Sequence, residues 1–252
     1  MPESFQHRLS QRAPLVGSFV KTAAPQVVEI AAIAGLDFVV LDAEHAPFSP
    51  ADIDHCVLAG RAAAIPVLVR VPDHVGPWIQ QALDVGSDGV MVPHVSSVNI
   101  AEHVVRSARY INGARGYSNS PRVGRYGTAS MADMIEAEDQ RAAIIVQIED
   151  RGGMENFVEI AAVPGVDALF IGVADLAAAF QAEGPSDPRM IDIIGKVTSF
   201  SAEQGRPCGG FFPQAIDNLP HGMSFCIVGS DQSFLRTGWR AALRAIRHLD
   251  QP

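Results

Sequence analysis

The sequence predicts an α/β protein that folds as a single (β/α)8 TIM barrel, and three observations support this. Short runs rich in β-branched residues alternate with longer helical patterns, as they do in βαβ units. Eight such runs occur in 252 residues, which is the strand number and chain length typical of a TIM barrel. An open, doubly wound sheet would carry a GxGxxG turn after the first run, but residues 17–23 read GSFVKTA. We therefore expect residues 1–252 to form one barrel domain.

The expected strands are apolar over most of their length, because parallel strands in a barrel are covered on both faces. In chain order they are Leu15–Val20, Asp37–Leu41, Val67–Val71, Gly89–Val92, Ala143–Ile148, Ala168–Ile171, Gly209–Phe212 and Ser224–Val228. Most are separated by one β/α unit of roughly 25–30 residues, as a barrel requires.

Helical patterns fill the intervals between the strands, and capping residues mark several of their ends. Ser49 and Ser97 are good N-caps, and Gly35 and Gly86 follow the last residues of two helical patterns. A further short helix is expected to begin at Asp175. The longer expected helices are Pro25–Ala34, Pro50–Ala63, His74–Val85, Val98–Arg109, Met131–Arg141, Gly153–Ala162, Pro188–Gln204 and Phe234–His248.

One connection is too long for a single β/α unit. Residues 93–142 hold two helices and the segment 114–127, which reads ARGYSNSPRVGRYG. All three tyrosines, Tyr110, Tyr117 and Tyr126, lie in or beside this segment. A long loop after a barrel strand often forms a lid or a substrate wall. The alternative is a surface loop or a subunit contact.

The composition excludes several classes of protein. Hydrophobic residues make up 48% and charged residues 19% of the chain, which excludes a disordered or fibrous protein. The net charge of −9 disfavours nucleic-acid binding, which needs a basic surface. No apolar run approaches the roughly 18 residues of a membrane span, and no signal peptide is recognisable. Because Cys56, Cys208 and Cys226 form no CxxC pair, we expect a protein of the reducing cytoplasm. From the charge and the lack of an apolar run, we expect it to bind neither nucleic acid nor membrane.

Polar residues that could carry chemistry cluster where the expected strands end. In a TIM barrel the catalytic groups lie at the carboxyl ends of the strands. These ends carry Asp42, Glu44 and His45 after the second strand, Arg70 in the third, His94 after the fourth, Glu149 after the fifth and Asp175 after the sixth. The opposite ends, such as residues 35–36 and 65–66, carry little comparable chemistry.

Glu149 and Asp175 are the candidate metal ligands. They lie 26 residues apart, which is one β/α unit, so adjacent strands would place both carboxylates on one side of the barrel mouth. Two carboxylates so close need a cation or a shared proton, and oxygen ligands favour Mg²⁺ or Mn²⁺. Open coordination positions would suit a chelating substrate such as a 2-oxo acid. The alternative is that Glu149 pairs with Arg151 or another arginine.

Arg70 and His45 are the candidates for charge stabilisation and proton transfer. Arg70 ends a buried strand, where an unpaired guanidinium is costly, and it could stabilise a developing enolate oxygen. A salt bridge from Arg70 to Glu44 or Asp42 is the alternative. His45 could act as a general acid or base, or it could be held in its loop by hydrogen bonds. His94 is a weaker candidate of the same kind.

Five motifs make the sequence similar to a known family. LDAEHAP at residues 41–47, VRVP at 69–72, LDVG at 83–86, VQIE at 146–149 and IGVADL at 171–176 occur in order and at consistent spacing. With them, the chain resembles the metal-dependent class II pyruvate aldolases of the HpcH/HpaI type from about Val16 to about Val228. That family includes 4-hydroxy-2-oxoheptanedioate aldolase, 2-dehydro-3-deoxyglucarate aldolase and hydroxy ketoacid aldolases.

The resemblance implies roles for the matched residues. Glu149 and Asp175 would bind the divalent metal, which would be Mg²⁺, Mn²⁺ or Co²⁺. Arg70 would stabilise the pyruvate enolate, and His45, paired with Asp84, would handle protons on the aldehyde or aldol oxygen. The family forms a homohexamer, a trimer of dimers that exchange the eighth helix. Because Asp84 ends a helix at the far end of its own barrel, we expect its contact with His45 to cross a subunit interface.

Further residues would contact the substrate. The resemblance implies that the backbone around Gly172, Ala174 and Asp175 holds the substrate carboxylate and that Gln147 supports the water shell of the metal. Phe211 and Phe212 end the seventh strand, and apolar walls there would suit a small or non-acidic aldehyde. The alternative is that one phenylalanine belongs to the core and the other packs against a helix.

The sequence thus predicts a carbon–carbon lyase that reversibly adds the enolate of pyruvate or hydroxypyruvate to an aldehyde, giving a 4-hydroxy-2-oxo acid. A class I aldolase would need a Schiff-base lysine. The chain has only two lysines, Lys21 and Lys196, and only Lys21 is expected near the mouth. The motifs also leave room for a CoA-thioester lyase of the citryl-CoA or malyl-CoA type and for a non-catalytic 2-oxo-acid binding protein.

Overall fold

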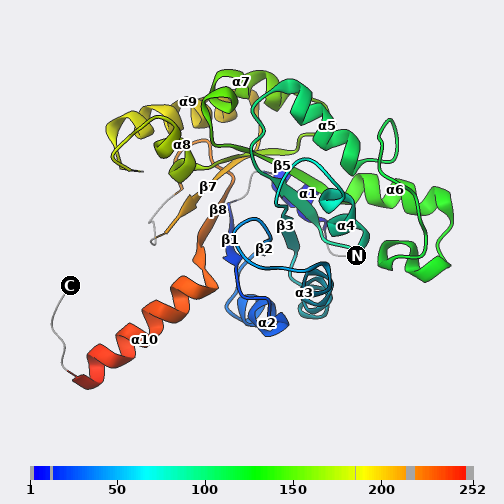
Figure 1. Cartoon of the computed structure of the whole chain (residues 1–252), viewed down its shortest axis with the longest axis horizontal. Coiled ribbons are helices and arrows are strands. Elements are labelled where there is room, and N and C mark those ends of the chain that lie inside the picture. Colours follow the sequence, from blue (N-terminus) through cyan, green and yellow to red (C-terminus); the bar gives the residue numbers. More distant parts are fainter. Residues whose placement is uncertain (1–2, 12–13, 185, 214–218, 248–252) are drawn as a thin grey trace.

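The computed structural model describes residues 3–11, 14–184, 186–213 and 219–247. Eight parallel strands close into a barrel in chain order, with helices around the outside (Figure 1). The strands are β1 (Leu15–Val20), β2 (Phe38–Asp42), β3 (Val67–Arg70), β4 (Gly89–Val92), β5 (Ala143–Ile148), β6 (Ala168–Ile171), β7 (Cys208–Phe212) and β8 (Phe225–Ser230). The predicted TIM barrel is therefore confirmed.

Four strands have the predicted bounds, and the other four differ by one or two residues at one or both ends. The difference that matters most is in β2, which extends to Asp42. Asp42 thereby becomes the register partner of Arg70, the last residue of β3. Parallel pairing brings these two strand ends together, so the register of β2 and β3 sets the ion pair described below.

The inside of the barrel is filled by side chains from alternate strand positions, because successive residues of a strand face opposite sides. A cluster of buried apolar residues lies there, including the rings of Phe19, Phe38, Phe170 and Phe225. Gly17 makes room for one of them, since a Cβ on Gly17 would lie 2.5 Å from the ring of Phe38. These rings form an apolar floor beneath the polar mouth.

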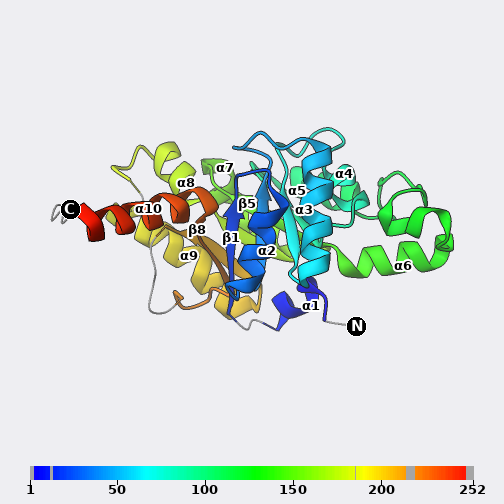
Figure 2. The same cartoon turned by 90° about the horizontal axis from the view of Figure 1, so that it is seen from below.

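A short helix, α1 (Phe5–Ser10), covers the end of the barrel opposite the mouth, and it was not predicted from the sequence. Phe5 and Leu9 are buried in the inner cluster, and the ring centroid of Phe5 lies 5.0 Å from that of Phe38. Figure 2 shows α1 at the lower edge of the barrel, beside the lower ends of the strands. Six residues are too few to give a clear helical period, which is why the segment reads only as polar.

The other helices wrap the barrel, and a larger cluster of buried apolar residues fills the space between them and the strands. The predicted helix His74–Val85 begins only at Trp78, because the N–H of Val75 donates to Asp73 Oδ1 in a turn (2.8 Å). His248, the predicted end of the last helix, lies outside the described residues. The helices are α2 (Pro25–Ile33), α3 (Pro50–Ala63), α4 (Trp78–Asp84), α5 (Val98–Ala108), the 3-10 helix η1 (Arg122–Gly127), α6 (Met131–Arg141), α7 (Arg151–Ala162), α8 (Val173–Ala179), α9 (Pro188–Gln204) and α10 (Asp231–Arg247). Over the described part of the chain, none of them is long and apolar enough to cross a membrane.

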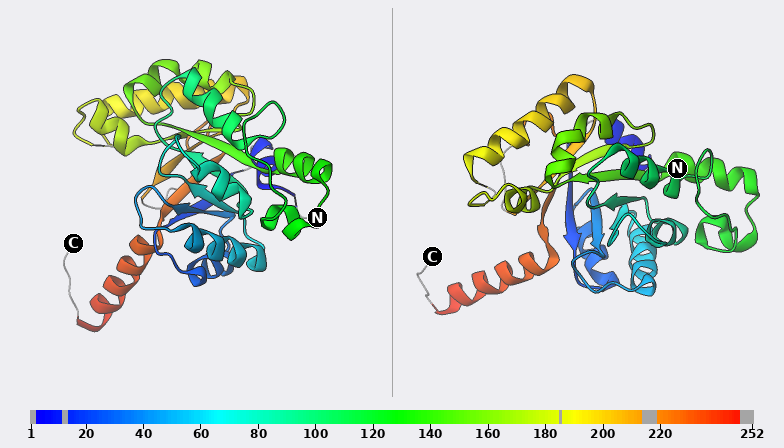
Figure 3. Two further views of the ribbon diagram at one scale, coloured as in Figure 1. Left: turned by 45° about the vertical axis from the view of Figure 1, so that its right-hand side comes forward. Right: turned by 45° about the horizontal axis from the view of Figure 1, so that its top comes forward.

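Helix α10 leaves the barrel at the end of β8 and points away from it, as Figures 1 and 3 show. Its apolar side chains are exposed, including Leu235, Leu243, Trp239 and Ile246. An amphipathic helix normally buries such residues against a partner. Within the part of the chain that the structure describes, α10 has no such cover for these residues.

The segment 114–127 lies against the outside of α3 and α4. Arg115 pairs with Asp84 at the end of α4 (2.7 Å). Arg122 donates to the carbonyl of Val85 (3.1 Å) and pairs with Asp54 on α3 (2.5 Å). These contacts favour a surface loop or a subunit contact over a lid on the mouth of the same chain.

Candidate active site

The mouth of the barrel carries a polar layer directly above the apolar interior. The inward phase of several strands continues into this layer. Just past β1, Lys21 follows the interior residue Phe19 by two positions; on β5 and just past it, Gln147 and Glu149 follow Ile145 in the same way. Since alternate residues of a strand face the same side, the pattern that builds the core also directs these polar side chains into the mouth.

Arg70 and Asp42 form a buried ion pair at the ends of β3 and β2. Arg70 donates from Nε to Asp42 Oδ1 (2.9 Å) and from Nη2 to Asp42 Oδ2 (2.7 Å). Asp42 is fully buried, and only 6% of Arg70 is exposed. The guanidinium also lies 4.5 Å from the ring centroid of Phe19. This two-point contact fixes the orientation of the guanidinium and leaves Nη1 facing Glu44 Oε2 at 3.2 Å.

Lys21 and the backbone of His45 also converge on Asp42. Lys21 Nζ lies 3.1 Å from Asp42 Oδ2, and the N–H of His45 donates to Asp42 Oδ1 (3.1 Å). Burial alone would raise the pKa of Asp42, but the hydrogen bonds and charge of Arg70, with those from His45 and Lys21, lower it below its ordinary value. Asp42 is therefore ionised at neutral pH and holds two cations at the mouth.

Glu44, His94 and Glu149 form a group that could hold a metal ion. Their ligand atoms all lie within 4.8 Å of one another. His94 Nδ1 lies 3.0 Å from Glu149 Oε1, and His94 Nε2 lies 3.4 Å from Glu44 Oε1. The close side-chain contact of Glu149 is thus with His94 and not with Arg151, which donates instead to the carbonyl of Ala179.

Two buried oxygen atoms beside this group have no hydrogen-bond partner among the described residues. They are Glu44 Oε2, which has a charge contact with Arg70 Nη1 but no hydrogen bond, and Gln147 Oε1, which has neither. The amide nitrogen of Gln147 donates to Glu149 Oε2, which leaves the amide oxygen unpaired. Buried oxygens without a donor are costly unless a cation or a water molecule satisfies them. Carboxylate and amide oxygens with one imidazole fit a divalent metal ion.

The backbone of His94 adopts the left-handed region, with φ at 56°, which is uncommon for a residue with a side chain. In this conformation its N–H donates to Glu149 Oε1 (2.7 Å). Strain of this kind costs on the order of 1–3 kcal/mol and is concentrated at functional sites. At His94, the strained turn orients a donor that holds the carboxylate of Glu149.

Glu149 lies in a crowd of negative charge. Burial is the largest cause that raises its pKa, and the charges of Glu44 and Asp175 raise it further, while the N–H and charge of His94 act in the opposite sense. Gly172 packs directly against this carboxylate, since a Cβ there would lie 2.8 Å from Glu149 Oε2. A cation would relieve the repulsion among these carboxylates. The charge of the predicted ligand Asp175 thus contributes to the raised pKa of Glu149, although the side chain of Asp175 is itself exposed.

His45 lies at the rim of the mouth. Its side chain is exposed, and its Nε2 lies 3.7 Å from Glu44 Oε2. The backbone is anchored through the hydrogen bond to Asp42, so the ring projects from a fixed point. This placement agrees with contact to a substrate that enters from solvent.

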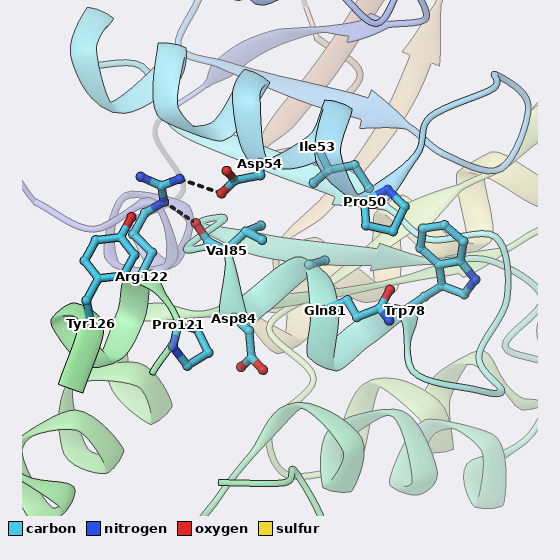
Figure 4. A pocket seen from close by; sticks show the side chains of 11 residues that line it. Pro50, Ile53, Asp54, Trp78, Gln81, Asp84, Val85, Pro121, Arg122 and Tyr126 are labelled. Atoms are coloured by element: carbon cyan, nitrogen blue, oxygen red, sulfur yellow. Dashed lines mark hydrogen bonds and ion pairs between the residues drawn. The ribbon is translucent and has the colours of Figure 1, made fainter. Parts of the chain in front are cut away.

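Asp84 lies far from this group within its own chain. It ends α4, which runs antiparallel to the strands and so ends opposite the mouth. Figure 4 shows Asp84 on the wall of a pocket of about 450 Å³ that Trp78 and Tyr126 also line. Its ion-pair partner is Arg115, whose side chain is fully buried. The predicted contact of Asp84 with His45 would therefore need a second chain.

Phe211 and Phe212 are both half-buried at the end of β7. Phe211 packs against the inner cluster, and its ring centroid lies 5.9 Å from that of Phe19. Because Phe19 in turn contacts the guanidinium of Arg70, Phe211 supports that group from below. The sequence allows Phe211 either a place in the core or a place in the substrate wall.

The structure gives three residues of the mouth contacts that the sequence does not predict: Glu44, His94 and Lys21. The strand-end rule includes Glu44 beside Asp42 and His45, but it does not mark Glu44 as a metal ligand. The role of His94 depends on a left-handed backbone conformation, for which a histidine gives only a weak signal. The sequence points to Lys21 only as a candidate for an imine, whereas in the structure its ammonium is ion-paired with Asp42.

Comparison with known proteins agrees with this geometry. The sequence model of the HpcH/HpaI aldolase/citrate lyase family matches residues 15–220. The chain belongs to this family. A 5-keto-4-deoxy-D-glucarate aldolase from Salmonella arizonae is 34% identical to it over 242 residues, which is 94% of either protein.

Solved structures of HpcH/HpaI proteins share the fold. One from Burkholderia cenocepacia is 30% identical, with a TM-score of 0.88 over 96% of this chain and 98% of the other. One from Desulfitobacterium hafniense is 28% identical, with a TM-score of 0.89 over 99% and 98%. The resemblance drawn from the five motifs is confirmed, and this HpcH/HpaI family member is a carbon–carbon lyase.

Proposed function

We propose that this HpcH/HpaI family member is a metal-dependent aldolase. It reversibly adds the enolate of pyruvate or hydroxypyruvate to an aldehyde, which gives a 4-hydroxy-2-oxo acid, and it catalyses the reverse cleavage. The observation that carries the proposal is the meeting of a fixed cation, Arg70, with a group of carboxylates around Glu149 at one mouth. The first can stabilise negative charge on a substrate oxygen, and the second can hold a divalent cation.

Glu149 is the proposed central ligand of that cation. It belongs both to the pair with Asp175 that the family resemblance implies and to the group with Glu44 and His94. When bound, the cation would polarise the carbonyl of the 2-oxo acid and make its C3 protons more acidic. A set of carboxylates and waters suits Mg²⁺, whereas a set that includes His94 suits Mn²⁺ or Co²⁺ better. Metal affinities of Asp175→Asn and His94→Ala would distinguish the two sets.

Arg70 is proposed to donate from Nη1 to the enolate oxygen. Its two contacts with Asp42 hold the guanidinium in place before the substrate arrives, so the reaction requires little reorganisation there. One preorganised donor at a developing oxyanion contributes about 10²–10³-fold in rate. From the sequence, a salt bridge to Asp42 was the structural alternative to a catalytic role for Arg70. With the guanidinium held in this way, the ion pair instead supports the catalytic role.

The remaining predicted residues complete the substrate site. The backbone around Gly172, Ala174 and Asp175 would hold the carboxylate of the 2-oxo acid, and Gln147 Oε1 would accept from ordered water. His45, at the exposed rim, would carry the proton to or from the aldehyde oxygen. Phe212 would form an apolar wall beside the aldehyde.

The proposed assembly is a homohexamer in which α10 is exchanged between subunits. The exposed side chains of Leu235, Trp239 and Ile246 on α10 support this, and so do those of Ile30 and Ile33 on α2. A second copy of the chain would cover both sets at once, because exchange is reciprocal between two identical subunits. In the same assembly, the pocket at Asp84 would receive the loop that carries His45 of another subunit.

The test is aldol addition itself. Pyruvate and hydroxypyruvate are incubated with a panel of aldehydes and with Mg²⁺, Mn²⁺ or Co²⁺ in turn. We expect a 4-hydroxy-2-oxo acid, no product in excess EDTA, and a loss of at least about 10²–10³-fold in kcat/KM for Arg70→Ala.

Arg151→Ala is the matched control. Arg151 follows Glu149 by two residues, but it contacts the carbonyl of Ala179 and the ring of Phe180, so we expect its rate within about twofold of wild type. Full activity in EDTA would refute the metal role. Turnover that needs a CoA thioester would indicate a CoA-thioester lyase instead, and trapping of a pyruvate imine on Lys21 by borohydride would indicate a class I aldolase.

A further inference from the structure

We propose that Arg115 is a positioning residue for proton transfer at the aldehyde oxygen, because it orients the carboxylate of Asp84 toward His45 of the partner subunit. This role rests on the proposed function, in which the loop of His45 enters the pocket at Asp84. It also accounts for the long connection between β4 and β5, for which the proposed function has no other use.

Arg115 is a buried cation with a fixed position. Its side chain has no exposed surface, and a guanidinium is costly to bury unless carboxylates pair with it. Its Nη2 lies 2.7 Å from Asp84 Oδ1, and its Nη1 lies 3.5 Å from Glu138 Oε2. The ring centroid of Tyr110 lies 4.5 Å from the guanidinium carbon. Burial raises the pKa of Tyr110 to about 12, so its ring packs there as a neutral group.

Of the two carboxylates, Asp84 is the one that Arg115 orients. Glu138 is held by a different cation, since Arg141 donates to it from Nε (3.0 Å) and from Nη2 (3.0 Å). A two-point contact of this kind is the stronger geometry for an arginine and a carboxylate. Arg115 makes its short contact with Asp84, and that contact is the hydrogen bond that holds the Asp84 side chain among the described residues.

Asp84 keeps one oxygen free for a second donor. Arg115 binds Oδ1, whereas Oδ2 has no hydrogen-bond partner within the described part of the chain. The side chain is 17% exposed and lines the pocket that Trp78 also lines (Figure 4). Because a carboxylate accepts at both oxygens, Asp84 can keep its contact with Arg115 while it accepts from the ring of His45. An aspartate in this place orients a histidine and stabilises its charged form.

The connection between β4 and β5 fixes the backbone of Arg115 before any partner binds. The N–H of Arg115 donates to the carbonyl of Arg109 (3.2 Å), and the N–H of Gly116 donates to Gln80 Oε1 on α4 (3.2 Å). Gly113 allows this tight return of the chain, since a Cβ there would overlap the carbonyl oxygen of Arg109. The guanidinium is therefore preorganised beside Asp84.

A purely structural role for Arg115 makes a different prediction from a positioning role. Loss of stability lowers the amount of folded enzyme and so reduces every activity by the same factor. Loss of positioning at Asp84 affects only the step that uses His45. In the proposed function, exchange of the C3 protons of pyruvate uses Arg70 and the metal at Glu149 but no proton on an aldehyde oxygen. The ratio of aldol addition to C3 exchange, measured on one sample, separates the two roles.

The test measures this ratio with pyruvate, Mg²⁺ and the aldehyde of the panel that wild type converts fastest. We expect Arg115→Met and Asp84→Asn each to lower the ratio by about 100-fold. Arg115→Lys keeps the charge but loses the planar fork and should lower it by roughly tenfold. Arg109→Met is the matched control. Arg109 lies in the same connection and is 11% exposed, but it pairs with Asp167, so its loss should leave the ratio unchanged.

The double variant Arg115→Met/Asp84→Asn tests whether the two residues act together. If Arg115 acts through Asp84, the double variant should show the ratio of Asp84→Asn alone, because effects of residues that act as a unit are not additive. Multiplied losses would contradict the inference. Mass photometry reports the assembly of each variant, and a ratio that falls only because the assembly dissociates would also count against positioning.

Further results would overturn the inference. Equal losses of addition and exchange in Arg115→Met would show a purely structural role. If that variant does not fold, a wild-type ratio in Arg115→Lys leads to the same conclusion. Normal exchange in wild type with an unchanged ratio in the Arg115 variants contradicts this inference alone. Absent exchange in wild type, or no aldehyde converted, contradicts the proposed function and this inference with it.

Discussion

Replacing Asp42 with asparagine removes the charge that holds Arg70 while it keeps the shape of the side chain. In the native structure, Asp42 is fully buried and accepts two hydrogen bonds from a guanidinium that is itself almost inaccessible. Breaking a buried ion pair by removing one partner costs about 3–5 kcal/mol. Since asparagine keeps one carbonyl oxygen that can accept from Arg70, we expect a loss of about 3 kcal/mol in the free energy of unfolding.

That loss corresponds to a fall of roughly 6–12 °C in Tm, because 1 kcal/mol shifts Tm by about 2–4 °C in a chain of this size. Activity should fall further than stability suggests. Without Asp42, the guanidinium of Arg70 can turn toward Glu44, which already lies 3.2 Å from Nη1. Misplacement of a catalytic group by about 1 Å can cost 10²-fold in rate, and we expect kcat to fall by about that factor.

The free energy is measured by urea unfolding, and kcat is measured by aldol addition at saturating pyruvate. Asp54→Asn is the control, because it makes the same chemical change in a more exposed pair with Arg122 and should cost less than about 1 kcal/mol. If Asp42→Asn unfolds within about 0.5 kcal/mol of wild type and keeps most of its activity, Asp42 does not hold Arg70 and the reasoning is wrong.

Three further predictions follow from other parts of the fold. Gly172→Ala should weaken Mg²⁺ binding, measured by titration calorimetry, because its Cβ would lie 2.6 Å from that of Glu149. Gly195→Ala is the control and should bind Mg²⁺ as wild type does, because its Cβ would meet no atom within 4 Å. Equal affinities of the two variants would argue that Gly172 does not keep Glu149 free to bind the metal. Trp239→Ala should yield smaller assemblies by mass photometry if α10 is exchanged, so an unchanged hexamer would count against that exchange. Burial raises the pKa of Asp88 above its unfolded value, so its protonation favours folding as pH falls through the folded-state pKa. Wild type should therefore gain stability relative to Asp88→Asn between pH 7 and pH 4, and a constant difference would contradict this.

The barrel and most of the candidate site could be predicted from the sequence for one reason. Core and site share the same strand alternation, so a rule about where strands end also selects Arg70 and Glu149. The exact register lies beyond that rule. The sequence leaves Asp42 and Glu44 open as partners of Arg70, and it is the register of β2 on β3 that places Asp42 opposite Arg70. Hydrophobic pattern alone does not fix this register, because the strand is apolar on both faces.

Other features depend on contacts that no local pattern records. The donor role of His94 depends on a backbone conformation that the surrounding structure imposes against its intrinsic cost. The course of α10 is a second case. Its amphipathic pattern predicts a helix that covers a barrel, but the pattern is the same whether the barrel is its own or that of another chain. The exposure of Trp239 becomes visible only in three dimensions.

The central claim is that this HpcH/HpaI family member forms an enolate with a divalent metal at Glu149 and with Arg70. Exchange of the methyl protons of pyruvate for deuterium in D₂O, followed by proton NMR without any aldehyde, tests it most directly. We predict exchange with Mg²⁺ or Mn²⁺, loss of exchange in EDTA, recovery when metal is restored, and no exchange for Glu149→Gln. Exchange that continues in EDTA at the same rate, or that survives in Glu149→Gln, would contradict the account.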